Sequence, residues 1–69
     1  MDRKRAFERV QLWLAMAECT KKSPSMAVAH KLANLVYNLT DGHEVYSTGF
    51  IYDVWCELLG FTKEGSDNE

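Results

Sequence analysis

Few side chains in this sequence are suited to catalysis or metal binding, and none belongs to a recognised motif. Asp53 and Glu57 are four residues apart, a spacing that would put both carboxylates on one face of a helix and could hold a divalent cation. Such a pair is more often a solvated acidic surface. His30 falls among apolar residues of an expected helix and His43 follows a turn, so we expect packed or exposed histidines. The sequence predicts no catalytic residue and no metal site.

The two cysteines, Cys19 and Cys56, have no close-spaced partner, which a CxxC redox pair or a zinc knuckle would need. The sequence also contains no glycine-rich phosphate loop and no GxSxG motif. We therefore expect no bound cofactor, and a protein that is not an enzyme. Two lone cysteines are typical of reduced thiols in the cytosol. A disulfide between them would need Cα atoms within about 7 Å.

The basic residues Arg3, Lys4 and Arg5 precede an apolar stretch over residues 10–17, as they would in a secretory signal. The uninterrupted apolar part, residues 12–17, is shorter than the roughly 7–15 residues of a signal core. It is also far shorter than the roughly 20 residues that cross a bilayer. We therefore expect a cytoplasmic protein that does not interact with membranes.

Three segments have the apolar periodicity of amphipathic helices, and we expect helices over residues 3–20, 24–39 and 49–59. Ser23 and Thr48 are the expected N-caps of the second and third helices, and Gly60 is the expected stop of the third. The expected core stripes are Ala6, Phe7, Val10, Trp13, Leu14 and Ala17; then Val28, Leu32, Leu35, Val36 and Leu39; then Phe50, Ile51, Val54, Trp55 and Leu58.

These helices predict an all-α fold, a compact three-helix domain over residues 1–61 with an acidic, disordered tail over 62–69. The region from 43 to 52 leaves alternatives open. A short extended segment near 43–47, or a hairpin continuing to Tyr52, would suit Val45 and Tyr46, which favour extended structure. A domain of 69 residues has a thin stability margin, because it buries a smaller fraction of its surface than a larger one.

Each expected helix carries apolar residues on a second side, away from its core stripe. These residues are Leu12, Met16 and Cys19 in the first helix, Met26, Ala33 and Tyr37 in the second, and Tyr52, Cys56 and Leu59 in the third. One monomer of this size cannot easily bury all of them, and exposed apolar surfaces usually mark interfaces. We expect a partner or dimer interface that includes Leu12, Met16, Met26, Tyr37, Tyr52 and Leu59.

Charge is unevenly distributed along the chain. Residues 1–31 hold seven basic and three acidic residues, whereas residues 32–69 hold one basic and seven acidic residues. The two halves could offset each other by packing together. Alternatively, the N-terminal cluster could contact nucleic acid or an acidic partner; it consists of Arg3, Lys4, Arg5 and Arg9.

Small three-helix domains are often helix-turn-helix DNA readers, which makes nucleic-acid binding the alternative function. Two features argue against it. The expected turn over residues 40–47 is longer than the usual three or four residues, and residues 49–59 contain Asp53 and Glu57 but no lysine or arginine. The function we expect is a small non-enzymatic protein–protein interaction module, an accessory regulator or inhibitor that also forms a homodimer. The identity of its protein partner does not follow from the sequence.

Overall fold

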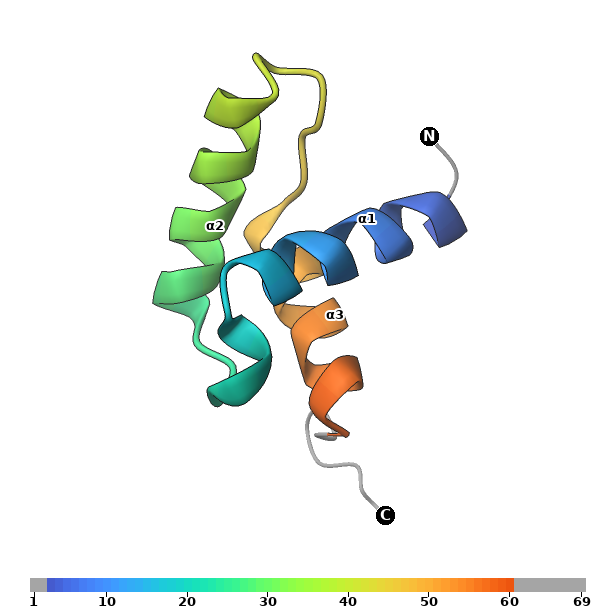
Figure 1. Cartoon of the computed structure of the whole chain (residues 1–69), viewed down its shortest axis with the longest axis vertical. Coiled ribbons are helices and arrows are strands. Elements are labelled where there is room, and N and C mark those ends of the chain that lie inside the picture. The colour runs from blue at the N-terminus through green and yellow to red at the C-terminus, as the bar shows by residue number, and fades with distance from the viewer. Residues whose placement is uncertain (1–2, 61–69) are drawn as a thin grey trace.

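The computed structural model describes residues 3–60, which fold into three α-helices and a short 3-10 helix (Figure 1). The elements are α1 (Arg3–Met16), η1 (Cys19–Lys21), α2 (Met26–Leu39) and α3 (Thr48–Leu59). These residues contain no strand, so the predicted all-α, three-helix fold is confirmed. The expected tail, residues 62–69, lies outside the described residues.

Helix α1 ends four residues earlier than the periodicity predicts. Ala17 and Glu18 form a tight turn, in which the Glu18 N–H donates to the Ala15 carbonyl at 3.0 Å. Glu18 has a left-handed backbone, with φ 60° and ψ 26°, and this stops the helix. The following 3-10 turn directs Cys19 into the core, where it is 3% exposed. Our expectation that Cys19 lies on an outward helix face was therefore wrong, because the helix has ended before it.

The left-handed backbone of Glu18 destabilises the folded protein. For a residue with a Cβ atom, this conformation costs about 1–2 kcal/mol. We expect Glu18→Gly to raise the free energy of unfolding by about 0.5–1 kcal/mol, the gain being reduced by the greater freedom of glycine in the unfolded chain. Urea unfolding measures the change. Glu18→Ala is the matched control, because it removes the carboxylate and keeps the strain; an equal gain in both variants would contradict the backbone explanation.

The second and third helices each begin with a serine cap. Ser25, rather than the predicted Ser23, precedes α2, and its hydroxyl accepts the N–H of Val28 at 3.3 Å. Ser47, rather than the predicted Thr48, precedes α3, and its hydroxyl accepts the N–H of Phe50 at 3.1 Å. Gly60 closes α3 in the left-handed conformation, with φ 76°, as the sequence predicts.

The link between α2 and α3 reverses the chain and then runs along the molecule as an extended loop. Asp41 and Gly42 both have left-handed backbones, with φ of 56° and 83°. The Gly42 N–H donates to the Tyr37 carbonyl at 2.8 Å, which closes the end of α2. Residues 44–47 then have no regular secondary structure, so the extended segment near 43–47 is a packed loop and no hairpin forms.

The core lies where α3 packs against both α1 and α2 (Figure 1). Its buried apolar residues are Val10, Leu14, Cys19, Ala29, Leu32, Val36, Ile51, Val54, Trp55 and Cys56. Trp55 is completely buried, and its indole N–H donates to the Cys19 carbonyl at 2.9 Å. Cys56 was expected to face outward but is 3% exposed. Both cysteines are free thiols.

Candidate interaction surface

The described residues leave an unusual amount of large apolar side chain on the surface. The exposed fractions are 49% for Leu12, 61% for Met16, 54% for Met26, 46% for Leu35, 51% for Tyr37, 63% for Leu39 and 66% for Val45. Isolated exposed apolar residues need no explanation, but contiguous ones usually mark a contact surface. Their arrangement on the helices therefore decides what they could do.

Four residues of the expected interface are exposed: Leu12, Met16, Met26 and Tyr37. The other two, Tyr52 and Leu59, are placed differently. Both are partly buried and pack against the core, because α3 contacts α1, α2 and η1 and so has packing neighbours on more than one side. Their contribution to a partner surface stays a prediction.

Helix α2 is apolar on both sides of its buried stripe. Its core contacts come from Ala29, Leu32 and Val36. With 3.6 residues per turn, Leu35 and Leu39 fall on one side of that stripe, and Met26 and Tyr37 fall on the other. Leu35 and Leu39 were expected in the core, and their exposure corrects that expectation. The apolar surface of α2 is therefore wider than the part of it that α1 and α3 cover.

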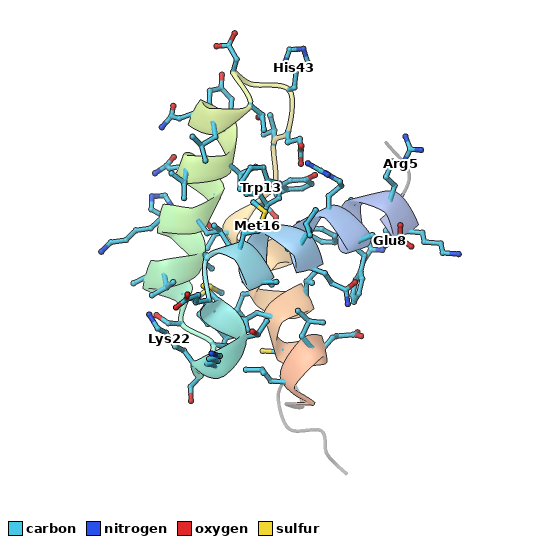
Figure 2. The ribbon with its side chains drawn as sticks, viewed as in Figure 1. Arg5, Glu8, Trp13, Met16, Lys22 and His43 are labelled. Atoms are coloured by element: carbon cyan, nitrogen blue, oxygen red, sulfur yellow. The ribbon has the colours of Figure 1, made fainter. Side chains whose placement is uncertain are left out.

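A shallow groove lies between the end of α1, η1 and α2, and we call it the α1–α2 groove. It has a volume of about 170 Å³ and is lined by Ala17, Cys19, Lys22, Val28, Lys31, Leu32 and Leu35. Figure 2 shows Met16 on the part of α1 nearest α2, and Lys22 beside η1. One turn separates Leu35 from Leu39 on α2, and Met16 directly precedes Ala17. Of the large exposed apolar side chains, Leu35 lines the groove, while Met16 and Leu39 are close to lining residues in the chain.

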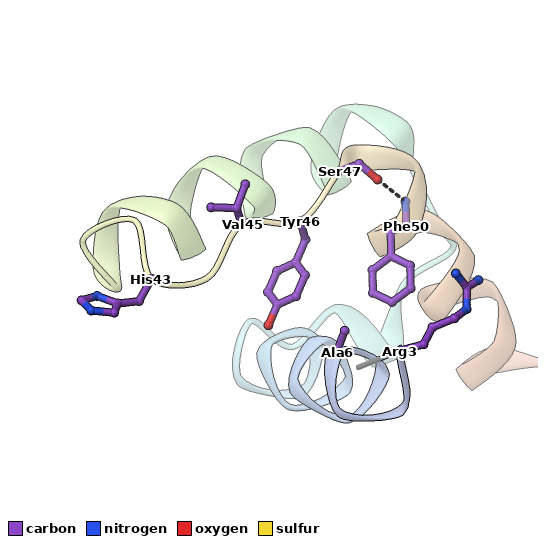
Figure 3. A pocket seen from close by; sticks show the side chains of 7 residues that line it. All are labelled: Arg3, Ala6, His43, Val45, Tyr46, Ser47 and Phe50. Atoms are coloured by element: carbon purple, nitrogen blue, oxygen red, sulfur yellow. Dashed lines mark hydrogen bonds between the residues drawn. The ribbon is translucent and has the colours of Figure 1, made fainter. Parts of the chain in front are cut away.

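A larger and more open groove, of about 650 Å³, lies between the N-terminal part of α1 and the loop before α3. Figure 3 shows Tyr46 and Phe50 side by side above Ala6 of α1, while His43 points away. The two rings are stacked, with centroids 6.2 Å apart and an interplanar angle of 24°. The Arg3 guanidinium lies 5.8 Å from the centre of the Phe50 ring.

The carboxylate of Glu44 attaches the loop before α3 to α1. We call Glu44 and its hydrogen-bond donors Arg9, Trp13 and Tyr46 the Glu44 cluster. Glu44 accepts hydrogen bonds from Arg9 Nη2 at 2.7 Å, Trp13 Nε1 at 3.0 Å and the Tyr46 hydroxyl at 2.8 Å. Its side chain is only 14% exposed, against 41% for Arg9. The hydrogen bonds from Arg9, supported by those from Trp13 and Tyr46, lower the pKa of Glu44 from 4.5 to about 2, although burial opposes the shift.

The Glu44 cluster was not foreseen from the sequence, and it changes how the basic N-terminal residues can act. Arg9 is held in the ion pair with Glu44, and Arg3 lies against Phe50. Arg5 also has a partner within the protein, and Lys4 remains exposed. Arg3, Lys4 and Arg5 are consecutive and point in different directions around α1, whereas Arg5 and Arg9, four residues apart, lie on the same side of the helix. Helix α3 itself carries no lysine or arginine.

The candidate catalytic groups are dispersed. Within residues 3–60 no three His, Cys, Asp or Glu residues come together in a way that could hold a metal ion. His30 Nδ1 lies 3.3 Å from the Thr48 hydroxyl, linking α2 to the start of α3. Asp53 and Glu57 border a small pocket next to Arg3. Burial raises the pKa of the Cys19 thiol, which disfavours the reactive thiolate.

None of the helices in the described part of the chain has both the length and the apolar character needed to cross a membrane. No known protein family, no curated protein and no solved structure matches this chain.

Proposed function

We propose that this protein is a small non-enzymatic interaction module that binds another protein through the apolar side chains on α1 and α2. In this role it acts as an accessory regulator or inhibitor of its partner. The observation that carries the proposal is the exposure of seven large hydrophobic side chains within residues 3–60, each at least 46% exposed. Large apolar side chains that gather on the surface of a small soluble domain usually mark an interface.

The types and positions of these residues support a contact with protein. Methionine and tyrosine are enriched at protein interfaces, and Met16, Met26 and Tyr37 are all more than half exposed. They are carried by α1 and α2, rigid elements that present them without a loss of loop entropy. A domain of this size also gains stability when a second chain covers its apolar surface.

The simplest such partner is a second copy of the chain, because two-fold dimers are the commonest soluble oligomers and let one apolar patch cover its own copy. We expect Leu12→Asp to weaken the dimer about a hundredfold or more. Burial of each leucine contributes about 1.5–3 kcal/mol, and a two-fold contact contains two copies. Sedimentation equilibrium of the wild-type protein and the variant measures the dissociation constants.

Asn34→Asp is the matched control, because it adds the same charge to the exposed polar side of α2 and should leave the dimer intact. Circular dichroism checks that both variants keep their helices. A monomeric wild-type protein at tens of micromolar would exclude the dimer. In that case, partners captured from the source cell by wild-type protein and by Asn34→Asp, but lost with Leu12→Asp, would still support an interaction module. Equal capture by all three proteins would contradict the proposal.

A further inference from the structure

The α1–α2 groove has the dimensions of a binding site for a single side chain. Ligand pockets for small molecules measure about 300–1,000 Å³, whereas this groove measures about 170 Å³. Its apolar lining comes from Ala17, Cys19, Val28, Leu32 and Leu35, of which Leu35 is 46% exposed. A groove of this kind suits one aliphatic or aromatic anchor from a protein partner, since such anchors in fitted pockets dominate binding energy.

The polar rim of the same groove is basic. Lys22 and Lys31 both line it, both are exposed, and neither forms an ion pair with the residues that the structure describes. Lys21, which precedes Lys22 at the end of η1, is also exposed. One acidic residue, Glu18, lies next to the groove in sequence but does not line it. The positive charges of Lys22 and Lys31 lie beside an apolar lining. They favour a partner that combines an apolar residue with carboxylates.

We propose that the α1–α2 groove binds an acidic amphipathic segment of a protein partner, which inserts one apolar side chain between Ala17 and Leu35 while its carboxylates pair with Lys22 and Lys31. The inference rests on the proposed function and names the chemistry of the partner at this surface. Leu39 lies one turn beyond Leu35 on the same side of α2 and is 63% exposed, so it extends the apolar contact to a second residue of the segment. The dimer contact through Leu12 is tested by its own variant.

Two synthetic peptides test the charge requirement. The first is a fluorescein-labelled amphipathic peptide of about 20 residues, longer than the roughly 12–15 residues below which an isolated helix is marginal in water, with leucines on one face and glutamates elsewhere. The second has lysine in place of every glutamate. We expect fluorescence anisotropy to show that the full chain binds the glutamate peptide at least about tenfold more tightly than the lysine peptide, with a preference that shrinks as salt is added.

Matched variants then locate the contact. Lys31→Glu reverses a charge at the groove, and Lys4→Glu makes the same change at an exposed position near the other end of α1. We expect Lys31→Glu to weaken binding of the glutamate peptide about tenfold or more, and Lys4→Glu to change it less than about twofold. Leu35→Ala should also weaken binding several-fold, whereas Val45→Ala, which removes another exposed apolar side chain, should not.

Each alternative outcome overturns the inference in a recognisable way. Equal binding of the two peptides would show that the groove does not select acidic segments. A loss of binding with Lys4→Glu but not with Lys31→Glu would place the contact at the N-terminal part of α1. If neither peptide binds but Leu35→Asp dissociates a dimer, the groove is covered by a second copy, and the proposed function survives while this inference fails. If no peptide binds and neither a dimer nor a captured partner exists, both fail.

Discussion

Trp55→Ala is expected to lower the free energy of unfolding by about 3–5 kcal/mol. The ring is completely buried at the centre of the core, so its removal leaves a cavity that the three helices cannot close without shifting. The change also removes the donor to the Cys19 carbonyl and leaves that carbonyl without its partner. A domain of 69 residues has a total stability of only about 3–10 kcal/mol. Far-UV circular dichroism during urea unfolding should therefore find the variant largely unfolded.

Trp55→Phe separates the two contributions and keeps enough of the ring for a folded protein. It retains most of the apolar volume but cannot donate to the Cys19 carbonyl, so we expect a loss of about 1–3 kcal/mol. The reference is Leu39→Ala, a truncation at a position that is 63% exposed, which should change stability by less than about 0.5 kcal/mol. An alanine variant at position 55 within about 1 kcal/mol of the wild type would contradict the placement of this ring in the core.

Stability is expected to fall by about 2 kcal/mol as the pH is lowered from 5 to 2, through protonation of Glu44. Its folded-state pKa, about 2, lies below the ordinary value of 4.5. The stabilisation is therefore complete above pH 4.5 and is lost as the pH falls towards 2. The full shift corresponds to more than this figure at 1.36 kcal/mol per pH unit, but Arg9 is 41% exposed and solvent weakens the pair.

Glu44→Gln tests this assignment directly, because it keeps the shape of the side chain and removes the charge. We expect the variant to be about 1–2 kcal/mol less stable than the wild type at pH 7 and to lose most of the dependence on acid. Glu57→Gln, at an exposed position of α3 outside the cluster, should keep the wild-type pH profile. Urea midpoints at pH 7, 5, 3 and 2 give the comparison. A variant at Glu44 that retains the full acid sensitivity would show that another carboxylate causes it.

The existence of the helices could be predicted because their signals are local. Apolar periodicity, serine caps and Gly60 act over a few residues, and the structure agrees with all three expected helices. The start of α2 shows the limit of such signals. Ser23 and Ser25 are both eligible caps, and the choice depends on how η1 packs against α3, which is a tertiary contact. The same is true of the left-handed Glu18, since glutamate is not a residue that normally predicts a helix stop.

The exposed surface was predicted less well, for a geometric reason. Periodicity shows that α2 has a broad apolar arc, but which part of the arc faces the core depends on where α1 and α3 cross it. Leu35 and Leu39 were therefore placed inside, although both are exposed. The Glu44 cluster joins residues 35 positions apart in the chain, and nothing in the local sequence around Glu44 or Arg9 indicates that they meet. The residue types Val45 and Tyr46 indicated only a preference for extended backbone.

The two tryptophans occupy such different surroundings that the protein carries two independent optical reporters. Trp55 is fully enclosed by the core, so its emission comes from an apolar, rigid environment and reports on the integrity of the helix packing. Trp13 is partly exposed and its indole N–H donates to Glu44, so we expect it to emit at longer wavelength than Trp55 and to report on the attachment of the loop to α1. Release of the loop by acid, or by a partner that pulls it from α1, should therefore change the fluorescence of Trp13 first.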